Sequence, residues 1–215
     1  MVAKKVLSYV LPQTIEAGKT TLGQTYEVNY ENGHKVLNSA NVNYSFGSLH
    51  QIMLKGIVEV LKTYQPKNIL MLGLGAGSAL QILQNKCHWP YTVTAVEIDP
   101  EMVALAQSHF GLNQYKHLSI QVADAATAVQ NFEPNQFDLI IDDVFWDDII
   151  PTFCMSDQYL QAVQRILSSE GVYWRNTMAN DLSDNYQQRY EQHFPKVHFL
   201  THKQYGNKLY FCQKS

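Results

Sequence analysis

The segment DLIIDDVFWDDIIP carries four carboxylates within a stretch of seven residues: Asp142, Asp143, Asp147 and Asp148. A carboxylate held beside a nucleophile can take its proton, and a group of carboxylates attracts cationic molecules. Side chains alternate along a strand, so Asp142 should point away from Asp143. We predict that Asp143, at the end of an apolar strand, is the chemically active carboxylate, whereas Asp147 also fits a solvated loop that caps the next helix.

Three glycines in the segment LGLGAGS, at Gly73, Gly75 and Gly77, follow an apolar run and precede a helical pattern. Glycine permits positive φ angles and a close approach of the backbone to a ligand, and the start of a helix offers unpaired N–H groups. The loop therefore predicts a nucleotide site, with a bare strand-to-helix turn as the alternative. Ser78 is the expected N-cap of the helix. It stands where the dinucleotide fingerprint G-x-G-x-x-G needs its last glycine, and no Gly-Lys-Ser/Thr follows as in a P-loop.

The next two predicted strands also end in acidic residues. Glu97 closes the segment YTVTAVEI, twenty residues after Gly77, and can accept hydrogen bonds from two ribose hydroxyls; an ordinary strand-end acid is the alternative. Asp99, before Pro100, is the expected N-cap of the next helix. Asp124 either accepts a hydrogen bond from an adenine amino group or caps the helix that follows it. Polar groups at three successive strand ends favour an adenosine with free ribose hydroxyls and no pyrophosphate.

The elements that position these residues alternate between strand and helix from about residue 66 onward. Strands that are buried on both faces of a parallel sheet read as apolar runs, and we expect them at 68–74, 91–98, 117–124, 137–145 and 172–177. Helices are expected at 48–64, 78–86, 100–111, 156–171 (closed by Gly171) and 181–194, and a hairpin at 196–214. This order predicts an α/β fold with a mostly parallel sheet covered by helices on both faces. We expect residues 1–48 to form a small β-strand appendage and residues 49–215 to form the nucleoside-binding domain.

Composition narrows the class of protein. The 215 residues are 46% hydrophobic, enough for a core, and the net charge of −3 argues against a nucleic-acid partner. The sequence has no apolar run near the roughly 20 residues that span a bilayer, so no membrane partner is expected, and the N-terminal segment lacks the apolar region of a signal peptide. Three widely spaced cysteines indicate neither a disulfide framework nor a zinc site. We expect a cytoplasmic protein without a metal.

The segments LGLGAGS, VEIDP, VADA and DLIIDDVFWDDIIP resemble class I S-adenosylmethionine-dependent methyltransferases, and more narrowly the spermidine synthase family of polyamine aminopropyltransferases. The resemblance covers about residues 66–215. It implies a Rossmann-like fold, with a mostly parallel seven-stranded sheet and an antiparallel C-terminal hairpin, and S-adenosylmethionine or decarboxylated S-adenosylmethionine as the donor. It also implies where the donor binds: the sulfonium arm at Gly73, Gly75 and Gly77, the ribose at Glu97, and the adenine at Asp124 and Ala125.

On the acceptor side, the resemblance places the catalytic proton acceptor at Asp143 and a substrate-binding acid at Asp148. Polyamine-making members carry Tyr-His-Glu on the helix before the sheet. The best match here is the segment LHQ, which leaves His50 as a candidate for substrate binding, although a lone helical histidine also fits a structural role. Where the family's appendage offers a Gln to the nucleoside, this chain has Asn43 or Tyr44. These departures question a polyamine substrate more than they question the nucleoside.

The predicted function is aminopropyl transfer from decarboxylated S-adenosylmethionine to a small-molecule amine, with Asp143 as the proton acceptor. An alkyl amine is mostly protonated at neutral pH, and its attack on a sulfonium carbon needs a free lone pair. One alternative is methyl transfer from S-adenosylmethionine to a small polar acceptor. Another is a non-catalytic nucleoside-binding homologue. The exposed edge strands of the appendage favour a homodimer.

Overall fold

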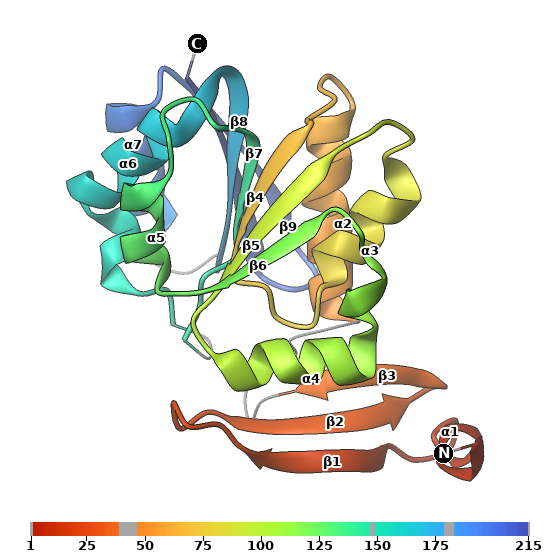
Figure 1. Ribbon diagram of the computed structural model, residues 1–215. Helices are drawn as coiled ribbons and strands as arrows, with labels where there is room; N and C mark the ends of the chain where they lie inside the picture. Colours follow the sequence, from red (N-terminus) through yellow and green to blue (C-terminus); the bar gives the residue numbers. More distant parts are fainter. Residues whose placement is uncertain (1, 39–46, 147–148, 179–182, 215) are drawn as a thin grey trace.

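The computed structural model describes residues 2–38, 47–146, 149–178 and 183–214. Its central strands are β4 Asn68–Leu72, β5 Thr92–Glu97, β6 Leu118–Val122, β7 Phe137–Asp142, β8 Leu167–Met178, β9 Lys196–His202 and β10 Asn207–Gln213. They form a seven-stranded sheet in the order β6-β5-β4-β7-β8-β10-β9 (Figure 1). The strands β4 to β8 pair in parallel, and β10 pairs antiparallel with β8 and β9. The predicted α/β fold, with its antiparallel C-terminal hairpin, is confirmed.

Helices cover both faces of this sheet (Figure 1). One face carries α2 Ser48–Leu61 and α3 Ser78–Lys86, and the other carries α5 Ala125–Asn131, α6 Asp157–Ile166 and α7 Ser183–His193. The run NILML in β4 shows why both faces are covered: Ile69 and Met71 belong to the first apolar cluster, whereas Leu70 and Leu72 belong to the second. No helix in the described ranges is long and apolar enough to cross a membrane.

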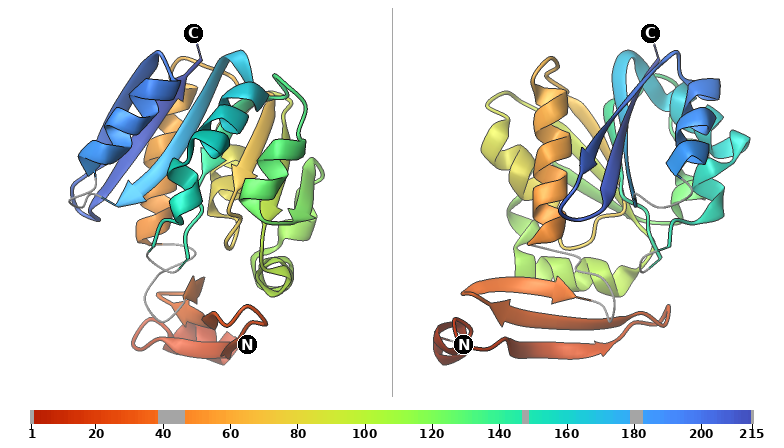
Figure 2. Two further views of the ribbon diagram at one scale, coloured as in Figure 1. Left: turned by 90° about the vertical axis from the view of Figure 1, so that its left-hand side faces the viewer. Right: turned by 180° about the vertical axis from the view of Figure 1, so that it is seen from behind.

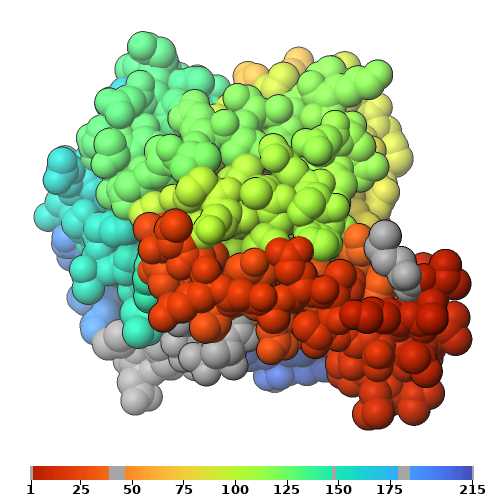
Figure 3. All heavy atoms as spheres, turned by 60° about the horizontal axis from the view of Figure 1, so that its bottom comes forward, coloured from red at the N-terminus to blue at the C-terminus, as the bar shows by residue number. Residues whose placement is uncertain are grey.

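The N-terminal residues form a separate layer below the large sheet. After the short helix α1 (Val2–Leu7), the strands β1 (Gln13–Lys19), β2 (Thr25–Glu31) and β3 (His34–Asn38) form an antiparallel sheet in the order β1-β2-β3. This appendage packs on α4 (Pro100–Phe110), because Val28 and Leu37 contact Met102 and Leu105. Figures 2 and 3 show the layer lying beside α4, at the edge of the large sheet where the parallel strands end. The β appendage is confirmed, and it includes the short helix α1 as well as the three strands.

Several predicted boundaries are wrong. The helix α6 ends at Ile166 rather than at Gly171, because β8 already begins at Leu167 and pairs with the first residue of β7. The strand β7 ends at Asp142 rather than at residue 145, and the helix α2 ends at Leu61 rather than at residue 64. The early end of α6 follows from this pairing with a distant segment.

Candidate active site

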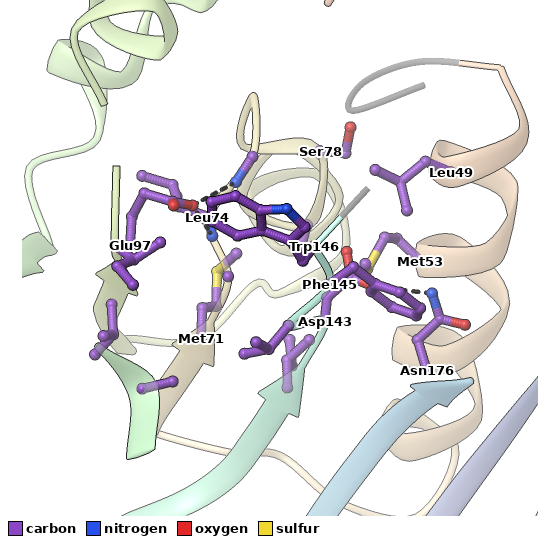
Figure 4. Close-up of a pocket in the computed structure, with 18 of the residues that line it drawn as sticks. Leu49, Met53, Met71, Leu74, Ser78, Glu97, Asp143, Phe145, Trp146 and Asn176 are labelled. Atoms are coloured by element: carbon purple, nitrogen blue, oxygen red, sulfur yellow. Dashed lines mark hydrogen bonds between the residues drawn. The ribbon is translucent and has the colours of Figure 1, made fainter. Parts of the chain in front are cut away.

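A pocket of about 730 Å³ opens at the edge of the large sheet where the parallel strands end (Figure 4). Ligands of open α/β sheets bind at this edge. One half of the pocket wall comes from the loops after β4, β5 and β6. The other half comes from the residues after β7, the end of β8, the start of β10 and the first turns of α2. Gln24, between β1 and β2, also lines the pocket, so the appendage contributes to its wall.

The glycine loop forms part of this wall with its main chain in the left-handed region. The φ angles are 83° at Gly73, 52° at Gly75 and 80° at Gly77. A Cβ atom on Gly73 would lie 2.7 Å from the carbonyl oxygen of Asp143, so a side chain there would push the loop away from the end of β7. Gly73 and Gly75 line the pocket, and their contact with a donor stays a prediction. Gly77 is not among the pocket residues, because it turns the chain into α3 and backs onto Leu112.

The start of α3 has no side-chain cap. Gly77 occupies the N-cap position, and the predicted cap Ser78 is instead the first helical residue. The first N–H groups of a helix have no partner within the helix. Ser78 and Ala79 line the pocket, so these N–H groups are available to an anionic group of a bound molecule.

Glu97 lies at the end of β5 and faces the glycine loop (Figure 4). Its Oε2 atom accepts hydrogen bonds from the backbone N–H groups of Leu74 (3.0 Å) and Gly75 (3.4 Å), and its Oε1 atom accepts one from Asp99 (3.1 Å). Burial raises the pKa of Glu97, and the three N–H groups oppose that rise. Glu97 therefore holds the loop in place while lining the pocket. Its contact with a ribose stays a prediction.

Two other predicted caps are present. Asp99 accepts a hydrogen bond from the N–H of Glu101 (2.9 Å) and caps α4, and Asp124 accepts one from the N–H of Thr127 (2.9 Å) and caps α5. Asp124 and Ala125 also line the pocket. The cap does not use all the acceptor sites of the Asp124 carboxylate, so its contact with adenine stays a prediction beside the capping role.

Asp143 follows β7 directly and lines the other half of the pocket. Its N–H donates to the carbonyl of Leu72 (2.8 Å), and its Oδ1 atom accepts a hydrogen bond from the side-chain N–H of Asn176 (2.8 Å). Burial raises the pKa of Asp143 to about 7; the Asn176 bond and the Arg175 charge oppose this rise. A carboxyl with this pKa can both accept and release a proton near neutral pH.

Asp142 points to the opposite face of the sheet, as the alternation of strand side chains predicts. It forms an ion pair with Arg175, and neither side chain is exposed (0% each). The hydroxyls of Tyr159 and Tyr173 both donate to its Oδ2 atom at 2.8 Å. Burial, followed by the Asp142 charge, raises the pKa of each tyrosine well above its usual value, so both hydroxyls stay protonated and can donate. The two adjacent aspartates therefore have separate environments.

Of the remaining predicted acceptor residues, Tyr44 and Asp148 lie outside the described residues, as do Asn43 and Asp147. His50 lies on α2, but it is not among the pocket residues, and burial lowers its pKa. Instead, the pocket is lined by apolar and aromatic side chains: Leu49, Ile52, Met53, Phe145, Trp146, Phe153 and Met178. The side chains of the described residues form no group of three or more His, Cys, Asp or Glu that could hold a metal ion.

Asn176 and Asn207 are among the polar residues of the pocket that sequence reasoning missed. Asn176 is near the end of β8, and Asn207 begins β10. The available signal was an asparagine at the end of the fifth predicted strand, beside the strand that leads to Asp143. For Asn207 the sequence offered no comparable signal, because the partner of the last strand is not visible in the pattern.

A glycine loop and strand-end acids at the edge of this sheet define a class I S-adenosylmethionine-dependent methyltransferase fold. Residues 65–211 match the family described as "Methyltransferase domain", and the chain belongs to that family.

The chain is similar in sequence to methyltransferases and to an aminopropyltransferase. The mouse eEF1A lysine and N-terminal methyltransferase is 31% identical over 182 residues, covering 76% of this chain and 26% of the relative. The chain thus spans about a quarter of the length of that relative. The polyamine aminopropyltransferase of Chromobacterium violaceum is 30% identical over 118 residues, covering 54% of this chain and 44% of the relative.

Solved structures similar to this chain also include a spermidine synthase and a methyltransferase-like protein. A spermidine synthase in complex with the transition-state analogue AdoDATO superposes with a TM-score of 0.77 at 19% identity, covering 94% of this chain and 74% of the other. Human methyltransferase-like protein 13 in complex with SAH superposes with a TM-score of 0.67 at 26% identity, covering 79% and 83%. The first similarity concerns the fold alone.

Glu97→Gln is expected to weaken the binding of S-adenosylhomocysteine by about 1–3 kcal/mol, measured by calorimetric titration. The substitution replaces one accepting oxygen by an amino group that cannot accept from the loop or from a ribose. Glu101→Gln is the matched control, because Glu101 contacts the N–H of Thr21 in the appendage and does not line the pocket. Equal affinity of Glu97→Gln and the unchanged protein would exclude Glu97 from donor binding.

Proposed function

We propose that this protein transfers the methyl group of S-adenosylmethionine to an amine and that Asp143 accepts the proton of that amine. The observation that carries the proposal is the Asp143 carboxyl at the pocket wall, which accepts a hydrogen bond from Asn176 and has a pKa raised by burial to about 7. Membership of the methyltransferase domain family supports the reaction class.

The reaction balances with these groups. Asp143 takes a proton from the acceptor ammonium, and the freed lone pair attacks the methyl carbon. The new N–C bond forms as the C–S bond breaks, and its electron pair stays on sulfur to give S-adenosylhomocysteine. Most of the rate enhancement would come from aligning nitrogen, carbon and sulfur within the pocket.

The donor end of the pocket favours S-adenosylmethionine over its decarboxylated form. Only the former carries a carboxylate, and the uncapped start of α3 at Ser78 and Ala79 offers N–H groups to an anion. A decarboxylated donor would leave these groups without a charged partner.

The described part of the acceptor end offers one carboxylate to an amine. Among the described residues, the carboxylates of the pocket wall are Glu97, Asp124 and Asp143. The first two accept hydrogen bonds from backbone N–H groups in the donor half of the pocket. That leaves Asp143, beside the side-chain amides of Asn176 and Asn207, to bind the acceptor amine.

The acidity of the acceptor favours a polypeptide N-terminus. An α-ammonium titrates near 8, so proton transfer to a carboxyl with a pKa of about 7 is uphill by about one unit, or about 1 kcal/mol. A lysine ammonium titrates near 10.4, which makes the same step uphill by more than three units, or roughly 5 kcal/mol. The name of the mouse relative includes both lysine and N-terminal acceptors, and we propose the N-terminal amine as the preferred one.

Aminopropyl transfer, the function predicted from the sequence, is the second candidate. The similarity to the Chromobacterium violaceum aminopropyltransferase favours it. In that reaction decarboxylated S-adenosylmethionine would donate three carbons and a nitrogen, and Asp143 would keep the same role.

Mass spectrometry of the products tests both candidates. The protein is incubated with each donor and with three acceptors: a peptide with a free N-terminus, an N-acetylated peptide with one lysine, and a diamine. We expect addition of one carbon to the free N-terminus from S-adenosylmethionine. Addition of an aminopropyl group to the diamine would support the second candidate. A protein that binds S-adenosylhomocysteine but modifies none of the acceptors would contradict both.

The rate of transfer is expected to rise with pH through about 7. Asp143 is protonated below its pKa and can accept a proton only above it, so the active form accumulates as pH increases. Measurement of kcat/KM between about pH 5.5 and 9, at constant ionic strength, reports this ionisation in the free enzyme. A rate that falls or stays constant across this range would exclude Asp143 as the proton acceptor.

A further inference from the structure

Three side chains, Asp143, Asn176 and Asn207, are linked by two hydrogen bonds into a hydrogen-bond chain, and Asp143 lies at one end of it. Asn176 donates from Nδ2 to the Oδ1 atom of Asp143 (2.8 Å), and Asn207 donates from Nδ2 to the Oδ1 atom of Asn176 (3.0 Å). Both asparagines are buried (3% and 4% exposed) and both line the pocket. Figure 4 shows Asn176 directed toward Asp143 at the ends of β8 and β7.

The strand register creates this hydrogen-bond chain. Asn207 pairs with Met178 in the antiparallel ladder of β10 and β8. Asn176 lies two residues before Met178 and therefore on the same face of the sheet, where diagonal neighbours reach each other. Gly206, with a φ of 69°, ends the turn that brings Asn207 to this position.

The direction of the chain follows from hydrogen-bond chemistry. An ionised carboxylate only accepts, whereas a primary amide has one donating and one accepting end. Asn176 can donate to Asp143 only when its oxygen points away from the carboxylate. In that buried orientation the oxygen needs a donor, and Asn207 supplies it.

We propose that Asn207 is a positioning residue for the transfer reaction: it holds the N–H groups of Asn176 toward Asp143 and so keeps that carboxyl as an anion ready to accept a proton. The reaction named here rests on the proposed function. The positioning itself is a property of the three side chains and can be measured without turnover.

Other charges also face Asp143. Arg175 lies behind it and favours the anion, whereas Asp142 and Glu97 disfavour it. After burial, the Asn176 bond is the largest influence on the pKa of Asp143, and it lowers that pKa. A substitution of Asn207 leaves all three charged groups in place. Its effect on the pKa of Asp143 therefore reports the orientation of the Asn176 amide alone.

The test is an NMR titration of the Asp143 carboxyl carbon in protein labelled at aspartate, with the signal assigned by its loss in Asp143→Asn. Asn207→Leu keeps the size of the side chain but removes the donor, and Asn207→Ala removes the donor with a smaller side chain in case the leucine variant does not fold. We expect the Asp143 titration to move up by about half a pH unit or more. Asn176→Leu, which removes the bond itself, sets the upper limit of the shift.

Thr177→Val is the matched control. The Thr177 hydroxyl donates to the carbonyl of Lys208 (2.8 Å), so this variant also removes a buried hydrogen bond between β8 and β10. Thr177 does not line the pocket. We expect the Asp143 titration to stay unchanged in this variant.

Turnover gives a second, separate readout. If methyl transfer is observed, Asn207→Leu should move the pH–rate midpoint upward by the same amount and lower kcat about two-fold or more at pH 7, with the affinity for S-adenosylhomocysteine unchanged. An Asp143 titration at the same pH in Asn207→Leu or Asn207→Ala as in the unchanged protein would overturn the proposal. An absence of product with every donor and acceptor would contradict the proposed function and leave the titration to decide the role of Asn207.

Discussion

Asp143→Asn is expected to lower the rate of methyl transfer by about 10²- to 10⁴-fold while S-adenosylhomocysteine still binds. Asparagine has nearly the same shape and can keep the hydrogen bond from Asn176 through its oxygen. It cannot accept a proton from the acceptor ammonium. Single-turnover rates and calorimetric affinities of the same preparations separate the two effects, and a variant with full activity would remove Asp143 from the mechanism.

The same substitution is expected to stabilise the fold at alkaline pH. Burial raises the folded-state pKa of Asp143 from 3.8 to about 7. The protonated Asp143 side chain therefore contributes its full stability to the fold below pH 3.8, and this contribution is lost as the pH rises through about 7. Asp143→Asn should therefore unfold like the unchanged protein near pH 4 and be more stable at pH 8, by up to about 4 kcal/mol. Glu133→Gln, at an exposed residue outside the pocket, is the control. A loss of stability at pH 8 would mean that Asp143 has a structural role.

Arg175→Met is expected to lower the free energy of unfolding by about 3–5 kcal/mol, measured by denaturant unfolding. Removal of the guanidinium leaves Asp142 as a buried charge without a cation. Arg175 also donates to the carbonyl of Val144 (2.8 Å), and its guanidinium carbon lies 5.4 Å from the centre of the Phe145 ring. The substitution should therefore also loosen the segment that follows Asp143.

Two controls distinguish a buried charge from lost packing. Arg175→Met combined with Asp142→Leu should recover part of the lost stability, because no charge is then left unpaired. Lys62→Met breaks the exposed pair with Glu59 and should change the free energy of unfolding by less than about 1 kcal/mol. A loss of less than about 1 kcal/mol in Arg175→Met would contradict the importance of the pair.

The parts of the site that the sequence predicts correctly depend on local rules. The opposite directions of Asp142 and Asp143 follow from the two-residue period of a strand. The cap at Asp99 follows from a helix that begins with proline, and the places of Gly73 and Glu97 on the pocket wall follow from their positions after apolar strands. These rules need no knowledge of how distant segments pair.

The parts that the sequence does not predict depend on such pairing. Asn207 reaches Asn176 only because β10 lies beside β8, and the hydrophobic pattern of either strand alone does not specify that neighbour. The end of α6 at Ile166 likewise follows from the pairing of Leu167 with β7. Ser78 loses the predicted capping role because Gly77 adopts a positive φ angle as it backs onto Leu112, a contact that local propensity cannot reveal.

The pocket draws its two halves from different stretches of sequence. The wall beside the glycine loop comes from residues 71–125, and most of the opposite wall comes from residues 141–207 with part of α2. Mutations in the later stretch can therefore reshape one wall of the pocket without disturbing the main chain of the glycine loop in the other. Divergence of this kind gives a physical reason why one sheet serves transferases that modify proteins and transferases that build polyamines.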